Sequence, residues 1–378
     1  MIQTGFTPKG RMLNAYRGLP VDRFPVAPEF WYYYPARLLG VDMIAFEREV
    51  PFWHALKTTF THWSCEGWGA AFGTATIDGA RTTKSDERIE DGRYRQTTRV
   101  RYKGREFVST KIFDVAQPSS VETFPVRNDD ELVPYLDMLL SDDVHIDNTG
   151  ASAAHGAVGE SYLLEYWLGL PFFDWVAEAI GFEQAIMWVT SVPEDERETL
   201  RQRYTDWMTA MTRQAIRETP FESFVIGCSS SCNSLLGPRL WRVLDKPVIA
   251  AVAREVHAAG KLLHIHFHGK SMETVSDFVE MGVDCVCPFE RPPGGDVQGM
   301  AGLRAVRDGL AERVTFNGNV HTVNTLIRGT PEDVRREVRE IKEAFADSRR
   351  CIIGTGDQVG RETPEENLMA MMEEAARP

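Results

Sequence analysis

The sequence predicts an α/β protein with a (β/α)8 TIM barrel, an N-terminal extension and an inserted antiparallel β-hairpin. From about residue 150, short apolar runs alternate with helix-length amphipathic segments, which is typical of a parallel sheet covered by helices. The number of these units favours a closed barrel, with an open doubly wound sheet as the alternative. No GxGxxG or GxxxxGK[ST] motif follows a strand, so dinucleotide and P-loop chemistry have no support.

The N-terminal third precedes the regular repeat. A helix over roughly 8–18 leads into "VDRFPVAPEFWYYYP", which predicts a strand followed by an aromatic cluster. Residues 68–115 have two runs of β-branched and aromatic residues, and Lys103-Gly104 between them predicts a hairpin turn. We expect this hairpin to elaborate one barrel domain that spans residues 1–378.

The regular part follows in order. Its apolar runs are "FVIGC", "KLLHIHF", "VDCVCPF", "RVTFNGN" and "CIIGT", each expected to be a buried strand. The segments between them, such as "KPVIAAVAREVHAAG" and "PEDVRREVREIKEAFAD", have helical periodicity. Thr330 and Thr363 each precede a proline and two acids, so both are predicted helix N-caps.

Composition excludes several classes of function. A net charge of −13 argues against binding to nucleic acid or anionic membranes, which requires basic patches. The start of the chain has no apolar signal-like core, and no apolar run is long enough to span a bilayer, so we expect a cytoplasmic protein. The six cysteines are scattered, which favours core thiols or ligands over disulfides.

The stretch "KLLHIHFHGKS" places His264, His266 and His268 at alternate positions, and these are three of only nine histidines. Alternate side chains of a strand share a face, so the three imidazoles point the same way. One such histidine is commonly a hydrogen-bonded core residue, but three without partners would cost several kcal/mol. We therefore predict metal ligation by His266 and His268, with His264 held behind them.

Other polar residues follow the ends of neighbouring strands, where barrel enzymes carry their chemistry. Glu290 closes "DCVCPFE". Cys287, two residues from the strand end, is either a core or a site residue. Asn319 and His321 lie in "RVTFNGNVHT", where they orient a substrate or satisfy the turn backbone. Asp357 lies in "CIIGTGDQVG", as an exposed carboxylate or an Asx-turn.

The predicted metal ligands are therefore His266, His268, Glu290 and Asp357. Two imidazoles with two carboxylates suit Zn²⁺ most simply, with Fe²⁺ or Mn²⁺ as alternatives. The residues come from separate strands, and the predicted barrel is what brings them together.

Four stretches together resemble the uroporphyrinogen decarboxylase superfamily, which includes corrinoid-linked methyltransferases. They are "GLPVDRFPVAPEF", "GKLLHIHFHGKS", "FNGNVHTVNTLIRGTPEDVRREVREI" and "IIGTGDQVGRETPEENLMAMMEEA". The resemblance covers most of residues 220–378, more weakly 8–40, and not the segment 68–115. It implies a (β/α)8 barrel.

Thiol-activating methyltransferases of this superfamily carry a His-x-Cys-Gly strand end, a later Cys and an intervening acid that together bind zinc. The matching positions here are His266-Phe267-His268-Gly269, Asp357 and Glu290, so both cysteines are replaced by harder ligands. This change puts in doubt zinc as the metal and a thiol as the substrate. The decarboxylase branch of the superfamily fits worse. That branch holds a polycarboxylate substrate with basic residues near its N-terminus, and the matching stretch here, "APEFWYYYPARLLG", contains only one basic residue, Arg37.

The resemblance and the harder ligands imply a metal-dependent methyltransferase that moves a methyl group from a small methoxylated substrate to a corrinoid (cobalamin). Because no Asp-x-His-x-x-Gly motif is present, the corrinoid would be carried by a separate protein. Glu160, Asn319 and His321 are the expected catalytic polar groups, and "EFWYYY" and "ESYLLEYW" the expected aromatic walls. The alternatives are a metal-dependent lyase, decarboxylase or hydrolase, and a non-catalytic metal or corrinoid carrier.

Overall fold

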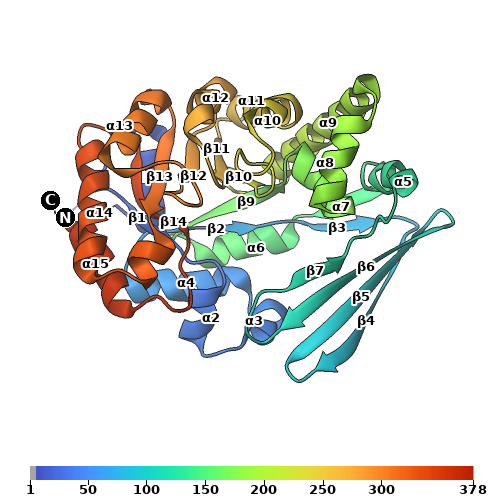
Figure 1. The fold of residues 1–378 in the computed structure, drawn as a ribbon, viewed down its shortest axis with the longest axis horizontal. Helices are drawn as coiled ribbons and strands as arrows, with labels where there is room; N and C mark the ends of the chain where they lie inside the picture. The colour runs from blue at the N-terminus through green and yellow to red at the C-terminus, as the bar shows by residue number, and fades with distance from the viewer. Residues whose placement is uncertain (1–5, 378) are drawn as a thin grey trace.

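A computed structural model describes residues 6–377 and contains an eight-stranded parallel sheet curved into a nearly closed barrel (Figure 1). Its strands are β1 (Val26–Glu29), β2 (Trp68–Ala71), β9 (Leu163–Gly169), β10 (Ser223–Cys228), β11 (Leu262–Phe267), β12 (Cys285–Pro288), β13 (Thr315–Val320) and β14 (Cys351–Gln358). The strand order is β1-β14-β13-β12-β11-β10-β9-β2. The predicted TIM barrel is confirmed, and the open doubly wound sheet is excluded.

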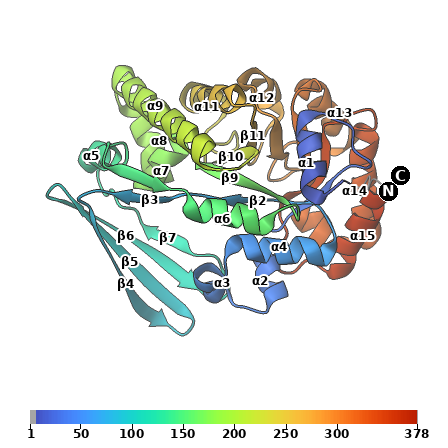
Figure 2. The ribbon, with the colours of Figure 1, turned by 180° about the vertical axis from the view of Figure 1, so that it is seen from behind.

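Helices cover the outside of the barrel (Figures 1 and 2). They are α4 (Phe52–Trp63), α6 (Thr149–Val158), α7 (Phe172–Ile180), α8 (Phe182–Ser191), α9 (Glu194–Glu218), α10 (Pro238–Leu244), α11 (Lys246–Ala258), α12 (Val275–Met281), α13 (Gly299–Leu310), α14 (Pro331–Ala344) and α15 (Glu365–Ala376). Short helical turns occupy Met272–Thr274 and Thr322–Ile327. None of the helices within residues 6–377 is long and apolar enough to cross a membrane.

The two predicted helix caps have different outcomes. Thr330 caps α14 in a reciprocal capping box with Asp333, as the sequence indicated. The predicted Thr363 cap is wrong, because Pro364 is still extended (ψ 139°) and α15 begins only at Glu365. Thr363 therefore lies one residue too early to reach the first turn of the helix.

The helix predicted over 8–18 is confirmed as α1 (Pro8–Arg17), and it closes the N-terminal end of the barrel. Met12, Ala15 and Tyr16 of α1 are buried in one cluster with barrel residues such as Leu163 and Val225. Because this end is plugged, the opposite end, where the strands finish, is the one available for a ligand.

The inserted sheet projects from the barrel on the side away from the termini (Figures 1 and 2). Its antiparallel strands are β4 (Arg81–Glu90), β5 (Arg93–Tyr102), β6 (Arg105–Asp114) and β7 (Ser120–Thr123), and a second pair is β3 (Thr74–Ile77) with β8 (Val144–Asp147). Three further helices flank this region: α2 (Tyr33–Leu39), α3 (Met43–Glu49) and α5 (Asp129–Leu139).

The predicted Lys103-Gly104 turn is confirmed, since Tyr102 pairs with Arg105 across it. The bounds of the insertion differ from the predicted 68–115. Trp68–Ala71 forms barrel strand β2, parallel to β9, and the inserted sheet continues to Thr123. A four-residue apolar run does not reveal which sheet it joins, because its periodicity is the same in both. The single domain over residues 1–378 stays a prediction.

Candidate metal centre

The side chains that converge at the C-terminal end of the barrel come from three strands. β11 and β12 run in parallel register, with His266 opposite Cys287, and β1 ends at Glu29. One ligand atom each from Glu29, His266 and Cys287 lies within 4.8 Å of the others. His266 Nδ1 is 3.0 Å from Cys287 Sγ, and His266 Nε2 is 3.8 Å from Glu29 Oε1. Carboxylate, imidazole and thiol are all zinc ligands, so this group fits a metal ion.

A second polar group adjoins the first. The rings of His266 and His268 have centroids 4.4 Å apart, and His268 Nδ1 is 2.9 Å from Glu290 Oε1. Gly269, with φ of +72°, turns the chain after β11 so that its N–H also donates to Glu290 Oε1 (2.9 Å). Asp357 shares a cavity with both histidines. The structure thus brings all four predicted ligands into one region.

The pKa values of these groups are strongly perturbed. Burial, and then the charges of His268 and His264, hold the pKa of His266 well below its usual value, so the imidazole is neutral and able to bind a metal. Burial raises the pKa of Glu29 to about 8, and Asp357 adds to the shift. Burial alone would lower the pKa of His268, but the hydrogen bond to Glu290 and the charge of Asp357 raise it to about 9. The crowded carboxylates favour an added positive charge.

A cavity of about 760 Å³ opens above these groups. Its lining consists of Glu29, Trp31, Tyr32, Phe46, Glu47, Val50, Phe52, Ala70, Phe72, Lys111, Phe113, Ser119, Trp167, Ser229, His266, His268, Asp357 and Gln358. The inserted sheet contributes Lys111 and Phe113, and both predicted aromatic stretches contribute rings. The volume and the apolar walls suit a small organic ligand.

The three predicted catalytic residues do not line this cavity. Glu160 precedes β9, at the plugged end of the barrel, where its exposed carboxylate accepts a hydrogen bond from Thr7 Oγ1 (2.6 Å). The structure therefore separates Glu160 from the other site residues. Asn319 is buried and donates to the carbonyl of Phe289 (2.8 Å), and His321 Nε2 lies 3.0 Å from the carbonyl of Pro292. Asn319 lies in β13 and His321 directly follows it, and both side chains contact the loop after β12.

Sequence reasoning missed Glu29 and left Cys287 undecided between core and site. Glu29 is the last residue of a four-residue buried strand, and Glu290 also comes after a four-residue buried strand. A carboxylate at the end of a short apolar run was therefore the signal that could have identified Glu29. Cys287 is 2% exposed and lies in one buried cluster with Cys285, so its distance to His266 is what marks it as a site residue. All six cysteines are buried and free.

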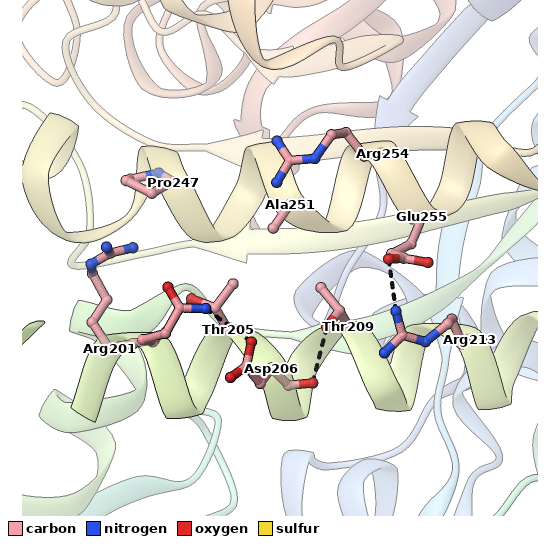
Figure 3. A pocket seen from close by; sticks show the side chains of 10 residues that line it. Arg201, Thr205, Asp206, Thr209, Arg213, Pro247, Ala251, Arg254 and Glu255 are labelled. Carbon is pink, nitrogen blue, oxygen red and sulfur yellow. Dashed lines mark hydrogen bonds and ion pairs between the residues drawn. The ribbon is translucent and has the colours of Figure 1, made fainter. Parts of the chain in front are cut away.

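A second cavity, of about 500 Å³, lies between α9 and α11 on the outside of the barrel (Figure 3). Its lining includes Arg201, Arg213 and Arg254, and Arg213 Nη1 pairs with Glu255 Oε1 at 2.7 Å. It contains no histidine or cysteine among its lining residues. The cavity above β11 is therefore the candidate site.

Comparisons with known proteins support the family and the barrel fold. The family model described as uroporphyrinogen decarboxylase (URO-D) matches residues 173–377. A solved methyltransferase from Methanosarcina mazei is similar over 98% of both chains, with a TM-score of 0.65 and 17% identity, which supports the fold. Structures described as an uncharacterized protein and an amidohydrolase cover 44% of this chain and 44% and 41% of their own, at 17% and 16% identity, with TM-scores of only 0.27 and 0.25. No curated protein matches the sequence.

Proposed function

This chain belongs to the uroporphyrinogen decarboxylase family, and we propose that it is a metal-dependent methyltransferase that moves a methyl group from a small methoxylated substrate to a corrinoid. The observation that carries the proposal is the group formed by the buried Glu29 and Cys287 with the half-buried His266 beneath an aromatic-walled cavity. The similarity in fold to a methyltransferase supports the reaction class.

Glu29, His266 and Cys287 would hold the metal, and His268 and Asp357 line the cavity beside them. Zn²⁺ fits a nitrogen, oxygen and sulfur donor set more closely than Mn²⁺, which prefers oxygen. The set of His266, His268, Glu290 and Asp357 expected from the sequence is the second arrangement. When bound, the metal supplies Lewis acidity toward a substrate oxygen, which makes that oxygen a better leaving group for methyl transfer.

The remaining side chains would position the substrate and manage protons. Glu290 binds Nδ1 of the protonated His268, which leaves Nε2–H free to donate a hydrogen bond in the cavity. There it would stabilise the oxygen released when the methyl group leaves. Trp31, Phe52 and Trp167 would hold an apolar substrate body and exclude water. We further propose that the corrinoid is carried by a separate protein.

A metal-dependent lyase or decarboxylase is the second candidate, because the pKa values of Glu29 and His268 suit proton transfer near neutral pH. Removal of carboxyl groups from a polycarboxylate needs several basic partners. Lys111 is the one lysine or arginine among the lining residues that the structure describes, which favours methyl transfer.

Elemental analysis by mass spectrometry tests the metal, using the wild type and a His266→Ala/His268→Ala double variant. We expect about one equivalent of zinc or another transition metal per chain in the wild type and its loss in the double variant. His145→Ala, which removes an exposed histidine on β8, is the control and should keep the metal. Failure of the wild type to take up zinc, iron or manganese would refute the metal-dependent mechanism.

The reaction is tested by adding cob(I)alamin and a panel of methoxylated compounds to the loaded protein. Spectral conversion of cob(I)alamin to methylcobalamin is the expected result. If the protein instead releases carbon dioxide or another fragment from a compound and leaves cob(I)alamin unmethylated, the lyase assignment replaces the methyltransferase.

A further inference from the structure

A chain of buried polar side chains crosses the barrel interior behind the candidate metal centre. Ser223 Oγ donates to Glu165 Oε1 (2.6 Å), and Glu165 Oε2 lies 2.8 Å from His264 Nδ1. His264 Nε2 in turn lies 3.1 Å from Cys287 Sγ. The chain therefore links β9, β10, β11 and β12 and ends on one of the proposed metal ligands.

These groups are fully enclosed. Glu165 and His264 have no exposed side-chain area. The rings of Trp68 and Tyr16 pack edge-on against the His264 imidazole, with centroids 4.7 and 5.7 Å away. Barrel interiors are usually filled with branched apolar side chains. A buried acid and imidazole cost free energy relative to such a core, so their retention points to a role at the site.

The hydrogen bonds fix the orientation of each member. A carboxylate only accepts hydrogen bonds, so Glu165 requires the proton of His264 on Nδ1. In neutral imidazole the other nitrogen then has a free lone pair, and Nε2 of His264 faces the thiol of Cys287 as an acceptor. The S–H is drawn toward His264, which leaves the sulfur lone pairs directed to the side of His266, 3.0 Å away. When the sulfur binds a metal, the S–H bond would break and its proton would pass to Nε2 of His264.

We propose that Glu165 and His264 are positioning residues that fix Sγ of Cys287 toward Glu29 and His266, so that Cys287 provides a sulfur ligand to the metal. This inference rests on the proposed function, because it requires a metal at that centre. It assigns His264 a role distinct from the other two histidines of β11. The proposal also gives the site one sulfur ligand, although both cysteines of the family's zinc-binding pattern are replaced in this sequence.

Cobalt substitution tests the proposal, because a thiolate bound to Co²⁺ gives a charge-transfer absorption band that nitrogen and oxygen ligands lack. Wild type, Glu165→Leu, His264→Leu and the double variant would be loaded with Co²⁺, and zinc affinity measured by competition with a chelator. We expect the band in the wild type and its weakening or shift in the variants. We also expect a loss of zinc affinity of about 10–100-fold in each single variant.

The double variant separates a chain acting in series from two independent effects. If Glu165 acts only through His264, Glu165→Leu/His264→Leu binds zinc no more weakly than His264→Leu alone. His264→Leu keeps the proposal testable should Glu165→Leu fail to fold. Glu165→Gln retains an oxygen that can accept from Nδ1–H, so it should restore most of the band and the affinity.

Two cysteine variants provide matched controls. Cys287→Ser should lose the band, whereas Cys285→Ser, two residues earlier on β12 and equally buried, should keep it. Wild-type affinity and band in Glu165→Leu, or additive losses in the double variant, would overturn the proposal. Metal uptake without a thiolate band overturns this inference but leaves the metal-dependent function standing. No uptake by the wild type overturns both.

Discussion

We expect a buried carboxylate beside the candidate-site cavity to make the stability of the protein depend on pH. Asp245 accepts hydrogen bonds from the Phe173 N–H (2.7 Å) and from Ser231 Oγ (2.5 Å), and its side chain is fully buried. Asp174 accepts from the N–H groups of Ser229 (2.7 Å) and Ser231 (2.8 Å). Because Ser229 lines the cavity, these two acids hold a loop of the site.

Burial raises the pKa of Asp245 from 3.8 to about 7, against the opposing effect of its hydrogen bonds. The folded protein therefore binds this proton more tightly than the unfolded chain, and stability falls as pH rises from about 4 to about 7. The loss is about 1.4 kcal/mol per pH unit in that window, or roughly 2 kcal/mol between pH 5 and pH 7.

Asp245→Asn removes the titration and keeps the shape of the side chain. The amide oxygen can accept from Phe173, and the amide nitrogen can donate to Ser231 Oγ. At pH 5 we expect the free energy of unfolding of the variant to be no greater than that of the wild type. Between pH 5 and pH 7 the wild type should lose about 2 kcal/mol that the variant does not lose. Urea unfolding of both proteins at several pH values measures this difference.

Asp142→Asn, at an exposed position, is the control and should follow the wild type at every pH. Parallel pH profiles for Asp245→Asn and the wild type would refute the reasoning, because they would mean that Asp245 gains no proton affinity on folding.

Three further substitutions test how the site is supported. Gly227→Ala places a methyl group 2.2 Å from the Trp167 ring, so the ring must shift within the cavity wall, at an overpacking cost of about 1–3 kcal/mol that thermal unfolding would detect; an unchanged melting temperature contradicts this. Thr330→Ala removes the cap of α14 and should cost about 1 kcal/mol in urea unfolding, and no loss would show that the cap is not stabilising. Glu66→Ala removes a buried carboxylate that accepts from the Val26 N–H (2.8 Å) and pairs with Arg23 Nη2 (2.8 Å). Because the arginine is left without its partner, the change should cost about 3–5 kcal/mol in urea unfolding, and a loss below about 1 kcal/mol would show that the pair is not stabilising.

Much of the site's outline followed from local patterns. The alternation of His264, His266 and His268 required all three to share a face, since strand periodicity is a property of the chain alone. Glu290 and Asp357 were predicted because each lies at the end of an apolar run: Glu290 follows β12, and Asp357 is the last residue but one of β14. The Thr330 cap and the Lys103-Gly104 turn were predicted for the same reason, since neighbouring residues suffice to form them.

Relations between distant segments had to come from the tertiary structure. Glu29 reaches His266 only because β1 closes the barrel beside β14, and Cys287 does so only through the register of β11 with β12. Trp68–Ala71 joined the barrel instead of the inserted sheet for a similar reason, which its own periodicity does not encode. Glu160 was separated from the site because the barrel has two ends.

The repeating strands and helices, the face on which the histidines lie and the polar strand ends could therefore be predicted from the sequence, because these features depend on spacing along the chain. Which of those strand ends meet could not be predicted in this way. Distances between side chains on different strands depend on strand order, register and closure, and these follow from the packing of the whole barrel.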